Sequence, residues 1–346
     1  MAFTPIPYGS FHSVCEGGHG VSFQQPRCKV LTMLSKKQEF ELLTSIRSRG
    51  EIPLKFVYLG EGALSWDEIS KHESNGGILS MESSLLSRHM ADFLNAFSGH
   101  KKLNIVDLGC GNGVPAISLI SKAQAAGFLV RYVPMDISGG LLDIAARNVR
   151  KAFPDVLVLP RQVDFEAGNF ADFVYELSKD GFANLFVFFG NTLGNASDAG
   201  RILTNFRDSM GSSDYLLVGT ELANLARIDL IRQRYADHKP IRRIHMMLPC
   251  QMGISEDDVD YEVSWNEREQ QIESKIRLKR DVQLQVGDES VCLKRNECLL
   301  LMRSRKYNEH MLTKQLSDAG FRNEVLTTDP ERSYILTLIQ PTRYSV

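Results

Sequence analysis

The sequence lacks the long apolar segments and the targeting signals that mark membrane and secreted proteins. None of its apolar runs approaches the roughly 20 residues that are needed to span a bilayer. Its first residues, MAFTPIPYGSFHS, contain no basic region followed by an apolar stretch, so no signal peptide is indicated. We therefore expect an intracellular, cytoplasmic protein with no membrane partner.

The sequence also has few cysteines and no clustered metal ligands. Its 6 cysteines include no CxxC pair, which fits neither a zinc site nor a disulfide scaffold. The 8 histidines are dispersed, and no Ser-His-Asp arrangement is evident. We therefore expect reduced thiols and no bound metal, and neither a hydrolase nor a metalloenzyme is indicated. The cysteines are Cys15, Cys28, Cys110, Cys250, Cys292 and Cys298.

An excess of charge of one sign is missing as well. The chain has 40 Lys and Arg residues against 42 Asp and Glu residues, for a formal net charge of -2. No overall positive field attracts such a chain to a phosphate backbone, so no nucleic-acid partner is expected. Hydrophobic residues make up 43% of the 346 residues, which is ordinary for a packed globular protein, and this length suggests two domains.

Between residues 103 and 221 the sequence alternates short apolar runs with amphipathic segments. The run LNIVDLG is followed by the helical PAISLISKAQAAG, and further apolar runs are FLVRYVPMDIS, ANLFVFFG and DYLLVGTEL. This alternation predicts an α/β fold with a parallel sheet and helices on both faces. Upstream, apolar residues at spacings of three and four predict amphipathic helices over residues 36–49 and 83–97.

The alternation stops after Glu221. A helical segment rich in Arg and Leu, LARIDLIRQRYAD, leads into stretches such as DYEVSWNE whose alternating residues predict antiparallel strands. A last helix, NEHMLTKQLSDAG, is expected to end at Gly320. Two further strands, NEVLTTD and SYILTLIQ, are assigned to the edge of the first sheet. The sequence thus predicts a second, α+β domain beside the parallel sheet.

The sharpest motif is VDLGCGNGVPA, which lies between a predicted strand and a predicted helix. Gly109, Gly111 and Gly113 permit a tight turn and close approach of the backbone, and the helix N-terminus that follows offers free N–H groups. The acidic Asp107 before the first glycine suits the methionine ammonium group of S-adenosylmethionine (SAM) better than the pyrophosphate of NAD. The motif favours SAM as the cofactor; the alternative for an isolated glycine triplet is an ordinary strand-to-helix turn.

Two further acidic residues at predicted strand ends support SAM. Asp136 ends the strand YVPMD, where a carboxylate can accept both hydroxyls of an adenosine ribose. Asp164 is expected to end the third strand, where its carboxylate can take the adenine amino group while the ring of Phe165 stacks nearby. Together with Asp107, these residues predict a class I SAM-dependent methyltransferase sheet of the Rossmann-like type.

From VFFGNTLGN (residues 187–195) onward, the chain resembles the histidine-specific SAM-dependent methyltransferase family. A G-x-T-x-G-N segment is typical of these proteins, and the resemblance extends to LKFVYLGEGALSWDEI and ECLLLMRSRKY. The family methylates the α-amino group of histidine or related amino acids, and relatives act on tryptophan-derived amino acids. The resemblance therefore implies a small, amino-acid-like substrate without specifying its side chain.

The resemblance also implies roles for particular residues. Tyr58 would lie in the substrate pocket, and its hydroxyl can help to pass a proton from the substrate ammonium to solvent. Asn195 would bind the substrate carboxylate or amino group, and Tyr235 would hold the carboxylate. Ser304 matches a serine that precedes a lysine and an aromatic residue in the family. Without the resemblance, both tyrosines have an ordinary interpretation as core residues with a surface hydroxyl.

Met302 is a departure from the family pattern. Histidine-specific members carry at this place, two residues before Ser304, a glutamate that pairs with the imidazole. A thioether removes that charge partner and favours a flatter or more apolar side chain, so we predict an aromatic or aliphatic amino acid rather than histidine. Arginine is a lesser option because it needs a compensating acid, for which Glu297, Glu82 and Asp67 are candidates.

The resulting scheme divides the chain into three parts. Residues 1–35 form an irregular leader, residues 36–75 and 222–306 a substrate-binding domain, and residues 76–221 and 307–346 the SAM-binding domain. The first functional hypothesis is an amino-acid N-methyltransferase of specialised metabolite biosynthesis. The alternatives are a methyltransferase acting on oxygen or nitrogen of an unrelated small molecule and a SAM-binding protein without catalysis. The oligomeric state is left open.

Overall fold

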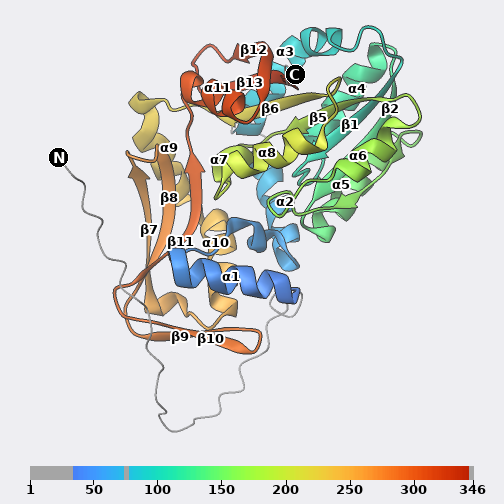
Figure 1. Ribbon diagram of the computed structural model, residues 1–346. Helices are drawn as coiled ribbons and strands as arrows, with labels where there is room; N and C mark the ends of the chain where they lie inside the picture. The colour runs from blue at the N-terminus through green and yellow to red at the C-terminus, as the bar shows by residue number, and fades with distance from the viewer. Residues whose placement is uncertain (1–33, 74–77, 343–346) are drawn as a thin grey trace, which may run out of the picture.

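The computed structural model describes residues 34–73 and 78–342. The leader expected over residues 1–35 lies almost wholly outside this part, as do Cys15 and Cys28. Two layers make up the rest of the chain (Figure 1). One is built on a large mixed sheet, and the other contains a smaller antiparallel sheet and the helices that pack with it.

The main sheet has eight strands in the order β12-β13-β6-β5-β1-β2-β3, with β4 also paired to β2. Pairing is parallel from β6 to β3, whereas β13 is antiparallel to both of its neighbours. The predicted parallel sheet, with the last two strands at one edge, is therefore confirmed. The strands are β1 (Lys102–Leu108), β2 (Leu129–Asp136), β3 (Leu157–Val158), β4 (Arg161–Gln162), β5 (Ala183–Phe188), β6 (Tyr215–Glu221), β12 (Phe321–Thr328) and β13 (Tyr334–Pro341).

Helices cover both faces of this sheet, as predicted. Alternate residues of β1 point to opposite faces, so Leu103 and Ile105 join one apolar core while Val106 and Leu108 join the other. The first core is closed by α3 (Ile78–Asn95), α4 (Val114–Ala125) and α5 (Gly139–Ala152). The second is closed by α6 (Ala171–Ser178), α8 (Ala199–Ser209) and α11 (Glu309–Asp318).

The order of the strands determines where a ligand can enter. From β1 the chain proceeds outward to β2 and β3, and then returns to the other side of β1 to form β5 and β6. The direction of winding therefore reverses between β1 and β5. In open α/β sheets the crevice at the carboxyl ends of the strands on either side of such a reversal is the usual ligand site.

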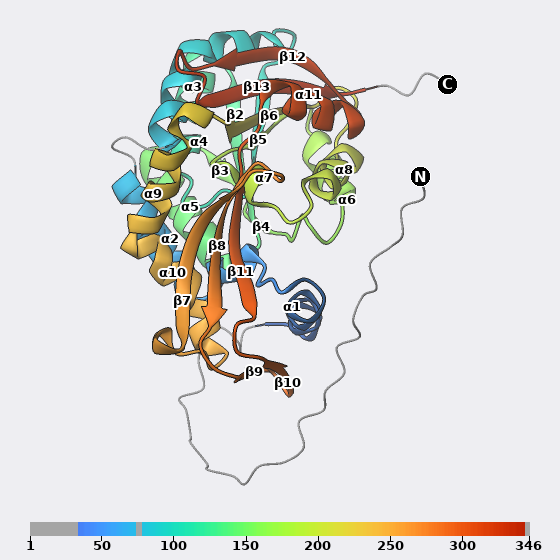
Figure 2. The same cartoon turned by 90° about the vertical axis from the view of Figure 1, so that its left-hand side faces the viewer.

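The smaller sheet consists of β11 (Cys298–Arg305), β8 (Gln271–Leu278) and β7 (Val259–Asn266), in that order and antiparallel. The hairpin of β9 (Val282–Val286) and β10 (Glu289–Leu293) lies at its far end (Figures 1 and 2). The predicted antiparallel strands are confirmed. Helix α1 (Lys36–Arg49) has the predicted bounds and begins with a capping box formed by Ser35 and Gln38.

Several elements were not expected from the sequence. They are η2 (Leu54–Tyr58), α2 (Glu61–Glu73), α7 (Thr192–Asn195), α10 (Lys239–Gln251) and η4 (Glu256–Asp258). The short η3 (Leu225–Arg227) occupies the first residues of the predicted helix LARIDLIRQRYAD. Helix α9 (Ile228–Asp237) corresponds to the predicted helix after Glu221, but α10 follows it directly. Helix α10 was not predicted because it contains two prolines, which usually interrupt a helix. Pro240 lies in the first turn, where a missing N–H costs little, and Pro249 lies near the end of the helix.

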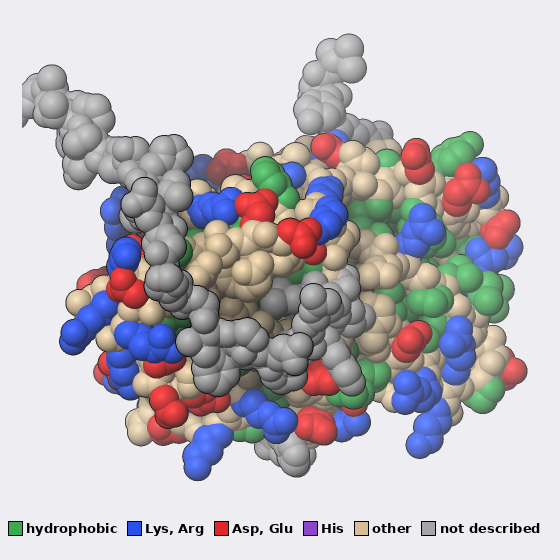
Figure 3. Space-filling model, turned by 90° about the horizontal axis from the view of Figure 1, so that it is seen from below, with side chains coloured by type: hydrophobic (Ala, Val, Ile, Leu, Met, Phe, Trp, Pro, Cys, Tyr) green, Lys and Arg blue, Asp and Glu red, His purple; other side chains and the backbone are tan. Residues whose placement is uncertain are grey.

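The surface carries both signs of charge. Lys and Arg side chains are interspersed with Asp and Glu side chains over the face seen in Figure 3. Within residues 34–73 and 78–342, no helix combines the length and the apolar character that a membrane crossing requires.

Candidate functional site

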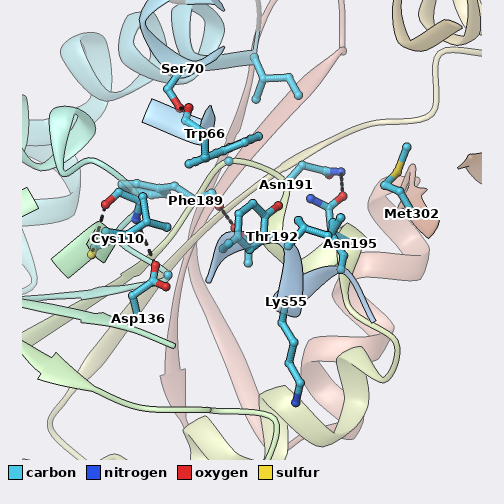
Figure 4. A pocket seen from close by; sticks show the side chains of 18 of the residues that line it. Lys55, Trp66, Ser70, Cys110, Asp136, Phe189, Asn191, Thr192, Asn195 and Met302 are labelled. Atoms are coloured by element: carbon cyan, nitrogen blue, oxygen red, sulfur yellow. Dashed lines mark hydrogen bonds between the residues drawn. The ribbon is translucent and has the colours of Figure 1, made fainter. Parts of the chain in front are cut away.

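A cavity of about 490 Å³ opens at the carboxyl ends of β1, β2 and β5, where the winding of the main sheet reverses. Its volume is in the range of small-molecule sites. The main sheet contributes residues such as Asp107 and Asp136, and the second layer contributes residues such as Tyr58 and Met302. Figure 4 shows side chains from both layers turned toward the same space.

The loop after β1 forms the wall at one end of the cavity. Gly109 and Gly111 have left-handed backbone, with φ of 67° and 52°, which residues with a side chain rarely adopt. The Gly109 N–H donates to the carbonyl of Met135 at 2.8 Å, and the Gly111 N–H donates to Asp136 Oδ2 at 3.3 Å. The loop is thereby held against the end of β2, with both glycines in the cavity wall.

Gly113 has a different position from the other two glycines of the motif. It caps the start of α4 with φ of 72° and is not a wall residue. A Cβ at this position would lie 3.0 Å from Ala145 of α5 and 3.1 Å from the hydroxyl of Tyr132. The structure therefore gives Gly113 a packing role behind the loop, where it allows α4 to approach α5.

Asp107 and Asp136 bring buried carboxyl groups to the same wall. Asp107 Oδ2 accepts from the Tyr132 hydroxyl at 2.8 Å, and burial raises its pKa to about 7. Asp136 Oδ1 accepts from the Ser138 N–H at 2.9 Å, and burial raises its pKa to about 6. Buried carboxyl groups of this kind are stabilised as carboxylates by a ligand that brings positive charge or hydroxyl donors.

Asp164 lies elsewhere than the sequence suggested. The third strand is broken into the short β3 and β4 and ends at Gln162, so Asp164 is in the following loop. Its Oδ2 accepts from Lys55 Nζ at 2.8 Å, and it is not a wall residue. Phe165 does line the cavity and packs edge-on against Phe188, with 5.7 Å between ring centroids. Of this pair, only the aromatic ring is presented to a ligand.

Glu82 of α3 adds a carboxyl group whose position the sequence did not indicate. Its Oε2 accepts from the Gly190 N–H at 3.0 Å and from the hydroxyl of Tyr334. Burial, with the nearby charge of Asp107, raises its pKa to about 7. Among the three acids considered for arginine recognition, Glu82 alone lines the cavity. Asp67 is hydrogen-bonded to Asn112 and Lys71 behind the wall, and Glu297 accepts from the N–H of a turn.

Two aromatic rings of the second layer line the cavity beside the glycine loop. Tyr58 at the end of η2 and Trp66 of α2 meet edge-to-face, with 5.4 Å between ring centroids. The indole nitrogen of Trp66 lies 3.4 Å from the point that a Cβ on Gly111 would occupy. The turn between the two elements depends on Gly62, where a Cβ would overlap the carbonyl of Val57 at 1.6 Å.

The segment GNTLGN (residues 190–195) brings Asn195 to the cavity. Gly190 and Asn191 both have left-handed backbone, and the short helix α7 follows. A Cβ at Gly194 would lie 2.6 Å from the carbonyl of Arg305, so only glycine lets α7 contact β11 this closely. Asn195 lines the cavity, and its Oδ1 accepts from Asn191 Nδ2 at 3.3 Å.

The structure brings together most of the remaining residues that the resemblance singled out. Tyr235 of α9 and Met302 of β11 line the cavity with Asn195. Ser304 is completely buried and is not a wall residue. Its Oγ lies 3.1 Å from the Tyr235 hydroxyl and 2.9 Å from Lys306 Nζ. Ser304 therefore supports Tyr235 from behind, which differs from the expected contact with a substrate.

The part of the wall that Met302 and α10 form is apolar and uncharged. Helix α10 contributes Ile241, Ile244 and His245, and it contacts β11, which carries Met302. His245 Nδ1 lies 2.9 Å from the hydroxyl of Tyr261, and burial lowers the pKa of the imidazole to about 3. His245 is consequently neutral at physiological pH. The sequence offered no signal for this residue because α10 was not anticipated.

The two ends of the cavity thus suit different chemistry. One end has a glycine loop and buried carboxyl groups, which suit a ligand with positive charge and sugar hydroxyls. The other end has an apolar lining with a few amide and hydroxyl groups and one guanidinium, that of Arg234, which is paired with Glu221. Across residues 34–73 and 78–342, no group of three or more His, Cys, Asp or Glu side chains is arranged to hold a metal ion.

Comparison with known sequences agrees with this geometry. The family model described as histidine-specific methyltransferase, SAM-dependent, matches residues 27–341. Among curated proteins, histidine N-alpha-methyltransferase of Mycolicibacterium smegmatis is 25% identical over 296 residues, which is 83% of this chain and 89% of that protein.

Two of the solved structures to which this chain is similar have low sequence identity to it. Magnesium protoporphyrin IX methyltransferase from Synechocystis PCC 6803, with bound SAH, is 12% identical with a TM-score of 0.44, covering 83% of this chain and 97% of that one. A SAM-dependent methyltransferase from Clostridium acetobutylicum is 10% identical with a TM-score of 0.43, covering 80% of this chain and 99% of that one.

Proposed function

The chain belongs to the histidine-specific, SAM-dependent methyltransferase family, and we propose that within this family it methylates the α-amino group of an amino acid, or of an amino-acid-derived metabolite, other than histidine. The observation that carries the proposal is the uncharged wall formed by Met302, the neutral His245 and the isoleucines of α10. An aromatic or aliphatic side chain fits this wall. We assign the reaction on such an amino acid to specialised metabolite biosynthesis.

The cofactor end of the cavity fits SAM. Gly109 and Gly111 present backbone to a ligand, Asp107 and Asp136 are buried acceptors for an ammonium group and for ribose hydroxyls, and Phe165 offers a ring. When bound, SAM supplies an electrophilic methyl group on its sulfonium. The chain's own contribution is to align an amine with that group and to exclude water, which the rings of Tyr58 and Trp66 are placed to do.

The substrate end favours a neutral side chain. Burial of an imidazolium or guanidinium group without a charge partner is costly. In the part of the chain that the structure describes, no carboxylate of the cavity wall comes from α10 or β11. The acidic wall residues are Glu82, Asp107, Asp136 and Glu166, the last of which is paired with Lys55.

The reacting amine must be neutral, so the site has to remove a proton from the substrate ammonium. Tyr58, through its hydroxyl, and Glu82, whose pKa is about 7, are wall residues able to accept or pass this proton. General-base residues work best when their pKa lies near the working pH. Tyr58 and Glu82 are therefore the groups to which we assign the proton transfer.

The proposal is tested by mass spectrometry of the products. The purified protein is incubated with SAM and an equimolar mixture of the common amino acids and simple tryptophan derivatives. We expect one or more methyl groups on an aromatic or aliphatic amino acid, and little or none on histidine. Methylation of histidine alone would contradict the proposal, and SAM binding by calorimetry with no methylated product would favour a non-catalytic protein or an unrelated amine.

Replacement of Met302 tests the role of the uncharged wall. Met302→Glu restores a carboxylate partner for an imidazole, so we expect the ratio of kcat/KM for histidine to that for the preferred substrate to rise about 10-fold or more. Met302→Leu is the matched control, because it keeps the volume and the apolar character, and it should leave the ratio within about 3-fold of wild type. If this ratio of kcat/KM values were unchanged in Met302→Glu, Met302 would not contact the side chain of the substrate.

A further inference from the structure

We propose that a buried polar network behind the cavity wall holds Asn195 and Tyr235 as hydrogen-bond donors, and that it thereby makes the site selective for a substrate carboxylate. This inference rests on the proposed function, in which an amino acid occupies the cavity. The family resemblance already implies a carboxylate contact for Tyr235 and allows one for Asn195; the inference names the buried residues that orient both side chains as donors. The network consists of Asn191, Glu221, Ser304 and Lys306.

The orientation of the Asn191 amide is determined by the backbone beside it. Its Oδ1 lies 3.2 Å from the N–H of Glu221 and 2.7 Å from the hydroxyl of Thr220. A backbone N–H can only donate, so the side-chain oxygen must face it. The NH₂ group of Asn191 then faces Ser304 Oγ at 2.9 Å and Asn195 Oδ1 at 3.3 Å. Because Asn195 accepts with its oxygen, its NH₂ group is left to face the cavity.

The direction of hydrogen bonding then passes through Ser304. A hydroxyl group has one proton and two acceptor positions. Asn191 Nδ2 and Lys306 Nζ, each 2.9 Å from Ser304 Oγ, can only donate, so they occupy both acceptor positions. The Ser304 proton is then directed to the Tyr235 hydroxyl at 3.1 Å. Tyr235 accepts this bond and keeps its own proton for a ligand in the cavity.

The charges of the network favour an anion at the same place. Glu221 is buried between Lys306 and Arg234, and Arg234 lines the cavity mouth. Burial opposes the charge of Glu221, but the two cations outweigh it and lower the pKa of the carboxyl group. Burial likewise opposes the charge of Lys306, but Glu221 outweighs it and raises the pKa of the ammonium. Arg234 and Lys306 thus both pair with Glu221, which places two cations on the side of the wall that carries Tyr235 and favours a substrate carboxylate there over its ammonium group.

Replacement of Asn191 by aspartate reverses the direction of the network with almost no change of shape. The variant Asn191→Asp keeps the acceptors for Glu221 and Thr220 but loses the donors to Ser304 and Asn195. Ser304 is then free to donate to the new carboxylate and accept from Tyr235, while Asn195 turns its NH₂ group away from the cavity. Both groups that face the cavity become acceptors, which repel a carboxylate.

The experiment compares amino acids with the same molecules lacking the carboxylate. Tryptophan, phenylalanine, leucine and histidine are assayed beside tryptamine, phenethylamine, isoamylamine and histamine, and binding of each is measured by calorimetry in the presence of S-adenosylhomocysteine. We expect wild type to prefer the amino acid, and Asn191→Asp to raise its KM and Kd by about 10- to 100-fold with little change for the amine. The affinity for S-adenosylhomocysteine, measured alone, checks that the variant is folded.

The matched control is Thr220→Val, which removes a hydrogen bond to the same Asn191 oxygen but leaves the Glu221 N–H to orient it. It should keep the preference for the amino acid over the amine within about 3-fold of wild type.

Ser304→Ala is a second variant, which frees the Tyr235 hydroxyl and should weaken binding of the amino acid alone. A wild type that accepts amines as readily as amino acids, or an Asn191→Asp variant with an unchanged preference, overturns the inference while leaving methyl transfer intact. If no amino acid is methylated or bound, the proposed function itself has failed.

Discussion

At the scale of single residues, the buried carboxyl groups of Asp107, Asp136 and Glu82 link ligand binding in the cavity to pH. Their pKa values of about 7, 6 and 7 mean that all are largely protonated at pH 5.5 and largely ionised at pH 8. A cationic ligand binds the ionised form better, so binding is coupled to loss of protons. His245, whose pKa is about 3, contributes nothing in this range.

We therefore expect the Kd for SAM, measured by calorimetry, to fall by about 10-fold or more between pH 5.5 and pH 8. Asp107→Asn should bind SAM more weakly at pH 8 and should lose part of this pH dependence, because the asparagine cannot ionise. An affinity that is constant over the range would show that these carboxyl groups do not meet the charge of the cofactor.

The same groups make a prediction about stability. A carboxyl group whose pKa is raised by folding favours the folded state at low pH, and this contribution is lost as the pH rises from about 4 to about 7. Bound SAM offsets that loss by stabilising the ionised carboxylates. The increase in Tm on addition of saturating SAM should accordingly be larger at pH 8 than at pH 5.5. The opposite order would mean that the carboxyl groups stay protonated in the complex.

At the scale of elements, the site depends on the contact between the short helix α7 and strand β11. This contact exists because Gly194 has no side chain: a Cβ there would lie 2.6 Å from the Arg305 carbonyl and 2.8 Å from the Asn191 amide. Both neighbours are held in place, Arg305 by the sheet and Asn191 by its hydrogen bonds. An added methyl group must therefore move α7, which carries Asn195.

We expect Gly194→Ala to lower the free energy of unfolding by about 1–3 kcal/mol and to raise KM for the amino acid, with little change in the Kd for SAM. Denaturant unfolding and steady-state kinetics measure the two effects. Gly168→Ala is the control, because a Cβ at Gly168 has nothing within 4 Å, and it should behave as wild type. A Gly194→Ala variant with normal KM would show that α7 can shift without disturbing the substrate.

At the scale of the whole molecule, Lys55 links the second layer to the main sheet. From η2 its Nζ contacts Glu41 of α1 at 2.6 Å, and Asp164 and Glu166 of the loop after β4 at 2.8 Å and 3.3 Å. Burial opposes the ammonium charge, but the three carboxylates outweigh it and raise the pKa of Lys55. Without Lys55, these carboxylates would face one another across the junction of the layers.

We expect Lys55→Met to destabilise the protein by about 1–3 kcal/mol at pH 8, because the loss leaves three partly buried carboxylates without their shared cation. The difference in Tm from wild type should shrink toward pH 5, because burial raises the pKa of Glu166 and its protonation relieves part of the repulsion. Lys314→Met, which breaks an exposed pair with Asp318, should have almost no effect. If the decrease in Tm of Lys55→Met were independent of pH, it would come from lost packing of the aliphatic part of the lysine side chain and not from its lost charge.

Local sequence patterns were sufficient for the class of fold and for the cofactor loop. The period of apolar residues is a property of each segment by itself, so the sheet, its covering helices and the bounds of α1 followed from the sequence. The turn at Gly109 and Gly111 is local too, because only a residue without a side chain adopts that backbone freely. The SAM dependence of the chain was readable for the same reason.

The tertiary structure alone decided how the substrate end of the cavity is built. Ser304 and Asn191 are 113 residues apart, and their hydrogen bond, with the burial of Ser304, turns an expected substrate contact into support for Tyr235. The sequence could not place His245 in the cavity because α10, which carries it, contains a proline near each end. Asp164 lies outside the cavity wall because its carboxylate accepts a hydrogen bond from Lys55, 109 residues earlier in the chain. The direction of a hydrogen bond depends on every partner that an atom meets in space, and the spacing of residues along the chain does not contain that information.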